Sequence, residues 1–225
     1  MLKNAQTPII KALSLGLGSL IVAKGQPRRL KQLTILLAIR EVLQESSNTS
    51  IQFYAQDPTF TRNDESFLDS LGIRILRTPS GSELGEASTV LDTSTLVYSP
   101  FLTLEAYEQL LGDGKSVQYL FGDDFDALLL KWPKQSAERV EAEGVIRNGL
   151  SGCRRRAVVG KDFWTKEDGT FPMAIIEGKC GTRCYEGDGL AQKHNISLHR
   201  KHLSFQTSIR YLPPPPRTGP ALHLR

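Results

Sequence analysis

The sequence predicts an α/β fold of the Rossmann-like class, built on one parallel sheet of about five strands. Short apolar runs alternate with helical patterns over about 115 residues, which is the spacing that parallel β/α units need. The first run ends in Gly16-Leu-Gly-Ser19, a turn at the point where such sheets bind ligands. Right-handed crossovers favour the strand order 3-2-1-4-5, with helices on both faces of the sheet.

Each predicted strand is a short run of aliphatic, β-branched or aromatic residues that ends at turn residues. The second strand ends at Asp57-Pro58 and the fourth ends at Ser99-Pro100, and proline cannot continue a hydrogen-bonded ladder. The fifth ends at Gly122-Asp-Asp124. The predicted strands are 9–15, 51–55, 73–76, 95–98 and 117–121.

Between these strands, apolar residues recur at three- and four-residue spacing, which predicts amphipathic helices. The second helix is expected to be capped by Asn63 or Asp64 and to end at Gly72. A Trp132-Pro133 pair interrupts the last helical pattern. The predicted helices are 27–44, 64–70, 102–111 and the interrupted segment 125–143.

Charge and periodicity divide the chain near residue 144. Residues 1–144 carry 14 Lys+Arg and 18 Asp+Glu, whereas residues 145–225 carry 14 and 6. The second segment also lacks a sustained hydrophobic period and is proline-rich near its end. We therefore expect a Rossmann-type domain over 9–143 and a largely disordered basic tail over 144–225. The pI of about 9.0 is no argument for nucleic-acid binding, because the domain itself is acidic.

The cysteines and histidines restrict the chemistry of the domain. All three cysteines and all four histidines lie after residue 152, so no thiol nucleophile or imidazole base exists within 1–144. The cysteines form no framework typical of secreted proteins. No apolar stretch approaches the roughly 20 residues that span a bilayer. We expect a cytoplasmic or nuclear protein without a membrane partner.

The candidate small-molecule site is the edge of the sheet where the strands end. An acid at the tip of the second strand occupies the place where adenosine-binding Rossmann folds hold ribose hydroxyls. Because strand order reverses between strands one and four, residues that follow strands one, two, four and five should face one crevice. The candidate ligand-binding residues are Gly16, Gly18, Ser19, Asp57, Ser99 and Asp123.

Structural interpretations compete with this site. The glycines can form a tight turn that needs positive φ, and no third glycine stands at dinucleotide spacing. Asp57-Pro58 can form a turn in which the aspartate bonds its own backbone. Asp123, Asp124 and Asp126 could hold a divalent cation, but adjacent acids on a solvated turn are more common. We expect no metal and can name no cofactor.

Two motifs in the basic segment also have competing interpretations. Cys180-x3-Cys184 followed by His194 and His199 resembles a zinc finger, but the gap of nine residues is short and apolar core positions are missing. Unpaired thiols are the favoured interpretation. The run Arg154–Arg156 could contact an acidic partner or nucleic acid, although such runs are usually only solvated.

Three motifs in order resemble the SRR-like (Sensitivity to Red-light Reduced) family. No single motif is specific for the family, but the order and spacing of the three motifs over residues 12–125 are fairly specific. The motifs are Leu15-Gly-Leu-Gly-Ser19 with Gln32, Gln56-Asp-Pro-Thr-Phe60 with Asp64 and Leu71-Gly72, and Thr95-Leu-Val-Tyr-Ser-Pro100.

The resemblance implies a regulatory protein rather than a known catalyst, with protein partners that it does not identify. Family members are linked to light signalling and circadian regulation in plants and to haem-biosynthesis regulation elsewhere, and no catalytic residues can be carried over. Many members have His after the last motif; Phe101 stands there, as in fungal-type members, so light signalling is not implied. Two alternatives stay open: an S-adenosylmethionine- or nucleotide-dependent transferase, and a protein-interaction module that acts through the basic tail.

Overall fold

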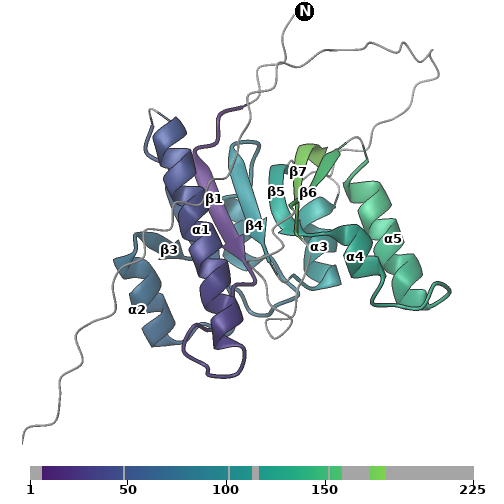
Figure 1. Cartoon of the computed structure of the whole chain (residues 1–225), viewed down its shortest axis with the longest axis horizontal. Coiled ribbons are helices and arrows are strands. Elements are labelled where there is room, and N and C mark those ends of the chain that lie inside the picture. Colours follow the sequence, from purple (N-terminus) through teal and green to yellow (C-terminus); the bar gives the residue numbers. More distant parts are fainter. Residues whose placement is uncertain are drawn as a thin grey trace, which may run out of the picture. The chain divides into compact units, whose positions relative to one another are not determined.

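A seven-stranded mixed sheet organises the chain (Figure 1). The structure is a computed structural model that describes residues 7–47, 49–100, 102–112, 117–151, 153–158 and 173–180. The strands are β1 (Lys11–Leu15), β2 (Gln52–Gln56), β3 (Ile73–Ile75), β4 (Thr95–Ser99), β5 (Val117–Asp123), β6 (Arg154–Val158) and β7 (Met173–Cys180). Their spatial order is β3-β2-β1-β4-β5-β7-β6.

The first five strands confirm the predicted topology. They pair in parallel in the order 3-2-1-4-5. β1 lies at the centre, with Ser14 opposite Ala55 on one side and Tyr98 on the other. Ala12 and Leu13 are 0% exposed, because neighbouring strands and helices on both faces cover them. This double burial explains why β1 is an almost continuous apolar run.

Helices cover both faces of the sheet, as predicted (Figure 1). The helices are α1 (Gln26–Ser46), α2 (Arg62–Ser70), α3 (Leu104–Leu111), α4 (Phe125–Leu129) and α5 (Ala137–Gly149). Side chains of α1 and α2 pack on one face with Ala12 and Phe53, whereas α3, α4 and α5 pack on the other with Leu13 and Val97. None of the described helices is both long enough and apolar enough to cross a bilayer.

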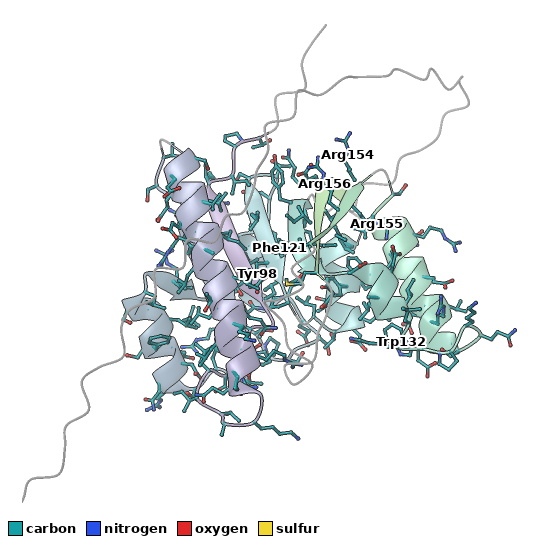
Figure 2. The ribbon with its side chains drawn as sticks, in the orientation of Figure 1. Tyr98, Phe121, Trp132, Arg154, Arg155 and Arg156 are labelled. Atoms are coloured by element: carbon teal, nitrogen blue, oxygen red, sulfur yellow. The ribbon has the colours of Figure 1, made fainter. Side chains whose placement is uncertain are left out.

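Tyr98 belongs to the core on the α1 side of the sheet. It is 0% exposed, and its hydroxyl donates a hydrogen bond to the Gln32 carbonyl oxygen at 3.1 Å. Its ring lies 5.6 Å from the ring of Phe121 (Figure 2). A buried tyrosine needs a partner for its hydroxyl, and the carbonyl of α1 supplies it.

The cap of α2 differs from the prediction. Thr61, rather than Asn63 or Asp64, is the N-cap residue. Its hydroxyl accepts from the Asp64 amide at 3.3 Å, and the Asp64 carboxylate accepts from the Thr61 amide at 2.8 Å. This is the reciprocal capping box that a Thr-x-x-acid spacing allows. The helix therefore begins at Arg62.

The prediction of disorder from residue 144 onward is wrong for the residues of this segment that the structure describes, 144–151, 153–158 and 173–180. α5 continues to Gly149, and β6 and β7 add two antiparallel strands beyond β5. Ile176 of β7 is 0% exposed and packs in the core with α3 and α5. β6 is exposed at every position and β7 has only a short buried run, so neither strand shows the hydrophobic alternation by which a strand is predicted. Residues 159–172 and 181–225 lie outside the described residues, so disorder there stays a prediction.

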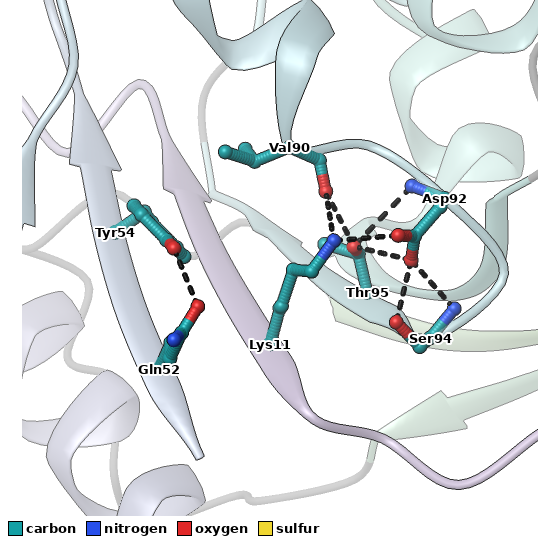
Figure 3. Close-up of polar contacts among 7 residues, drawn as sticks. All are labelled: Lys11, Gln52, Tyr54, Val90, Asp92, Ser94 and Thr95. Carbon is teal, nitrogen blue, oxygen red and sulfur yellow. Dashed lines mark hydrogen bonds and ion pairs between the residues drawn. The ribbon is translucent and has the colours of Figure 1, made fainter.

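An ion pair fixes the amino end of the sheet (Figure 3). Lys11 Nζ lies 2.5 Å from Asp92 Oδ2, and Asp92 Oδ1 accepts from the Ser94 amide at 2.8 Å and the Ser94 hydroxyl at 2.6 Å. Burial alone would raise the pKa of Asp92, but the hydrogen bonds from Lys11, Ser94 and Thr95 lower it to about 2. The loop before β4 is thus held against the start of β1.

The contribution of β7 can be measured with neighbouring isoleucines. Ile176→Ala should lower the free energy of unfolding by about 2–5 kcal/mol, because it leaves a cavity in a buried site. Ile175→Ala is the matched control, since Ile175 points to the other face and is only half-buried. Urea denaturation of the full chain measures both. Equal, small losses in the two variants would show that β7 is not part of the cooperative fold.

Candidate functional site

A cleft of about 200 Å³ opens at the carboxyl ends of β1 and β2. Its walls come from the turns after these strands, the loop after β3 and the start of α3. The apolar wall includes Leu15, Leu84 and Leu102. The polar residues that line it are Gln56, Asp57, Thr59, Thr78, Ser80, Glu83 and Thr103. The cleft therefore lies at the sheet edge that the strand order predicts for a ligand.

Asp57 ties the turn after β1 to the turn after β2. Its Oδ2 accepts from the Gly18 amide at 2.8 Å. Its Oδ1 accepts from the Thr59 amide at 2.8 Å and the Thr59 hydroxyl at 2.5 Å. Gly16 and Gly18 both have φ of 75°, a conformation that favours glycine. The turn interpretations of the glycines and of Asp57 are thus realised in the structure.

A buried carboxylate, Asp64, holds the rest of the turn after β1. Asp64 is 0% exposed. It accepts 2.8 Å hydrogen bonds from the Ser19 hydroxyl, the Leu20 amide, and the amide and hydroxyl of Thr61. Burial alone would raise the pKa of Asp64, but the hydrogen bonds from Thr61, Ser19 and Leu20 outweigh it and lower the pKa. Ser19 therefore bonds to α2 rather than lining the cleft.

Ser99 and Asp123 form a separate buried cluster with Tyr107 of α3. The Tyr107 hydroxyl lies 3.1 Å from Ser99 Oγ and 3.1 Å from Asp123 Oδ2. Asp123 is 4% exposed, and its Oδ1 has no hydrogen-bond partner in the described part of the chain. Burial raises the pKa of Asp123 to about 7, although the Tyr107 hydrogen bond and the charges of Lys131 and Arg28 act in the opposite direction.

The six predicted site residues thus fall into three groups. Two line the cleft, Gly16 and Asp57. Two others, Gly18 and Ser19, do not line the cleft and donate hydrogen bonds to the carboxylates of Asp57 and Asp64. The other two, Ser99 and Asp123, do not line the cleft and join Tyr107 instead.

Three features were not predicted from the sequence. Asp64 holds the turn after β1, Tyr107 forms hydrogen bonds with Ser99 and Asp123, and the loop after β3 lines the cleft. The Thr-x-x-Asp spacing was the available signal for Asp64. Tyr107 offered none, because its position on the apolar face of a helix predicts only core packing.

The acids at the end of β5 have different roles. Asp124 caps α4 by accepting from the Asp126 amide at 3.1 Å, and Asp126 lies 3.4 Å from Arg155. In the described ranges, no three or more His, Cys, Asp or Glu residues converge as a metal site. Phe101, Cys184, His194 and His199 lie outside the described residues.

Comparison with known families places these features in context. The family model for the SRR1 domain matches residues 1–163, which include the glycine turn, Asp57, Asp64 and the whole of β6. No curated protein matches the chain.

The anchoring role of Asp64 predicts that its substitution lowers the stability of the fold and that this contribution to stability depends on pH. Asp64→Asn should lower the free energy of unfolding at pH 7 by about 2–4 kcal/mol, since buried donors lose a charged acceptor. Because the folded-state pKa is lowered, this stabilisation is present above the unfolded pKa of about 4 and disappears as pH falls through the folded pKa. Denaturation at pH 7 and pH 3 measures it.

The control for this experiment is Asp69→Asn on the exposed side of the same helix. It should leave stability unchanged at both pH values. An Asp64→Asn protein as stable as wild type at pH 7 would contradict the anchoring role.

Asp123 predicts the opposite pH dependence. Its folded-state pKa of about 7 lies above the unfolded value of about 4, so the folded protein binds the proton more tightly. Stability should therefore fall as pH rises from about 4 to 7, by up to about 4 kcal/mol. Asp123→Asn should remove this slope. Melting temperatures at pH 4.5 and pH 8 measure this pH dependence. The control is Asp126→Asn at an exposed position, which should keep the wild-type dependence. If wild type and Asp123→Asn lost the same stability between the two pH values, the raised pKa of Asp123 would be contradicted.

Proposed function

Because the chain belongs to the SRR1 domain family, we propose that it is a regulatory protein that binds a small ligand in the cleft at the carboxyl ends of β1 and β2. The position of the cleft carries this proposal. Open α/β sheets bind ligands outside the carboxyl ends of their strands, next to the point where strand order reverses. Here that point lies between β1 and β4, and residues that follow both strands line the cleft.

The lining favours a neutral or cationic ligand with several hydroxyl or amine groups. Its polar side chains are hydroxyls, one amide and the carboxylates of Asp57 and Glu83. The described residues that line it include no Lys, Arg or His, so it has no side-chain cation for a polyphosphate. A volume of about 200 Å³ suits a nucleoside or a smaller molecule, because drug-sized ligands use about 300–1,000 Å³.

Asp57 is the residue best placed to orient such a ligand. A carboxylate offers about four acceptor positions, and Gly18 and Thr59 occupy three of them. The remaining lone pair can accept from a ligand hydroxyl while the turn stays intact. This explains how one acid can hold the turn and also contact a ligand.

The biological role within this proposal rests on the family. Circadian or light signalling and haem-biosynthesis regulation are the roles that the family suggests. Phe101, at the position where many members have His, supports a fungal-type member and a role outside light signalling. A cytoplasmic or nuclear location is part of the same proposal.

The cleft can be filled without straining the backbone. A Cβ at Gly81 would lie 3.8 Å from Pro58 Cγ, and both residues line the cleft. Wild type should bind adenosine in isothermal titration, because Asp57 holds the place of a ribose-binding acid. S-adenosylmethionine, which is larger than a nucleoside, is titrated separately to test the transferase alternative. Gly81→Leu should weaken adenosine binding by at least about tenfold with an unchanged melting temperature.

Gly144→Leu is the matched control, because a Cβ at Gly144 meets nothing within 4 Å. It should bind as wild type does. If adenosine does not bind, the proposed ligand class is wrong; if Gly81→Leu binds adenosine as tightly as wild type, the proposed cleft is wrong. Methyl transfer from bound S-adenosylmethionine would support the transferase alternative instead.

A further inference from the structure

The strand β6 ends the sheet and has an open edge. It pairs only with β7 among the described strands. All five of its residues are exposed, so neither of its faces is covered in the part of the chain that the structure describes. In an antiparallel strand, alternate residues direct both their N–H and C=O groups toward the outer edge. These groups can pair with another extended chain.

The open edge carries concentrated positive charge. Arg154, Arg155 and Arg156 are consecutive on β6, at the end of the sheet far from β3 (Figure 2). Arg155 contacts Asp126 of α4 at 3.4 Å, and Arg156 lies 3.8 Å from Glu177 of β7. These exposed pairs are weak, and no ion pair to Arg154 is present among the described residues. The strand therefore keeps a net positive charge.

Strand geometry sorts the three arginines onto two faces. Successive side chains alternate, so Arg154 and Arg156 share one face and lie about 7 Å apart. Arg155 is on the other face. Its cross-strand partner on β7 is the buried Ile176, and its side chain contacts Asp126 of α4. The face with two arginines has only Glu177 as a described ion-pair partner.

We propose that β6 binds an extended acidic peptide of a partner protein, which adds to the sheet as a further strand. Main-chain hydrogen bonds along the edge provide affinity, and acidic side chains at every second position meet Arg154 and Arg156. Cross-strand neighbours are about 4.5–5.5 Å apart, a distance that permits ion pairs. The peptide must be extended, because only then does its two-residue repeat match that of β6.

The surroundings favour a peptide over a nucleic acid. Asp126 and Glu177 lie beside the arginines, and residues 1–144 carry more acids than bases. A phosphate backbone would approach those acids along its whole length. A single peptide strand touches only the edge and the two arginines next to it.

The test uses the full chain and a fluorescein-labelled peptide of alternating Glu and Thr. Fluorescence polarisation should show saturable binding at low salt. Arg154→Glu with Arg156→Glu should weaken binding by at least about tenfold, whereas Arg154→Lys with Arg156→Lys should retain most of it. The matched control is Lys134→Glu with Arg147→Glu, which makes the same change in net charge at exposed positions on other elements. That control should bind as wild type does.

Two further probes separate strand addition from general charge attraction. The same peptide with alternate amides N-methylated keeps its charges but cannot donate along one edge, and should not bind. Hydrogen exchange on the wild-type complex should show new protection within 154–158, a readout that does not depend on any variant folding. Binding of the methylated peptide, equal competition by oligothymidine, or protection confined to other segments would each overturn the proposal.

Discussion

The buried Asp64 carboxylate is the interaction on which the turn after β1, next to the cleft, depends. Four donors from two segments reach it, and two of them belong to the turn after β1. A buried charge is tolerated only when hydrogen bonds replace its water. Asp64 therefore specifies one position of that turn relative to α2. In that position the Gly18 amide donates to Asp57, which lines the cleft, at 2.8 Å.

Two buried carboxylates at the same end of the sheet show how donor number controls their behaviour. Asp64 accepts four hydrogen bonds and its pKa is lowered, although it is fully buried. Asp123 accepts from Tyr107, its Oδ1 has no partner among the described residues, and its pKa is raised to about 7. The same type of side chain thus has a lowered pKa where donors surround it and a raised pKa where one oxygen has no described partner.

The sequence predicts the parallel part of the fold well, because that part is recorded in local patterns. Apolar runs and turn residues mark β1 to β5, and right-handed crossovers then leave one favoured order. The location of Asp57 beside the cleft follows from the same topology. The pairing of Tyr107 with Ser99 and Asp123 could not be predicted, since it depends on how α3 lies on the sheet. β6 and β7 were missed for two reasons. β7 joins β5 across the intervening α4, α5 and β6, and β6 exposes every residue, which removes the alternation that identifies a strand.

The two late strands also change which edge of the sheet is open. Without them, β5 would present an edge with buried, apolar neighbours such as Leu120, a surface prone to self-association. β7 covers that edge and contributes Ile176 to the core. The exposed edge moves to β6, which is short and carries three arginines. Like charges oppose the pairing of two copies of this edge, while an acidic chain meets no such barrier. The same side chains can therefore prevent aggregation and select a partner.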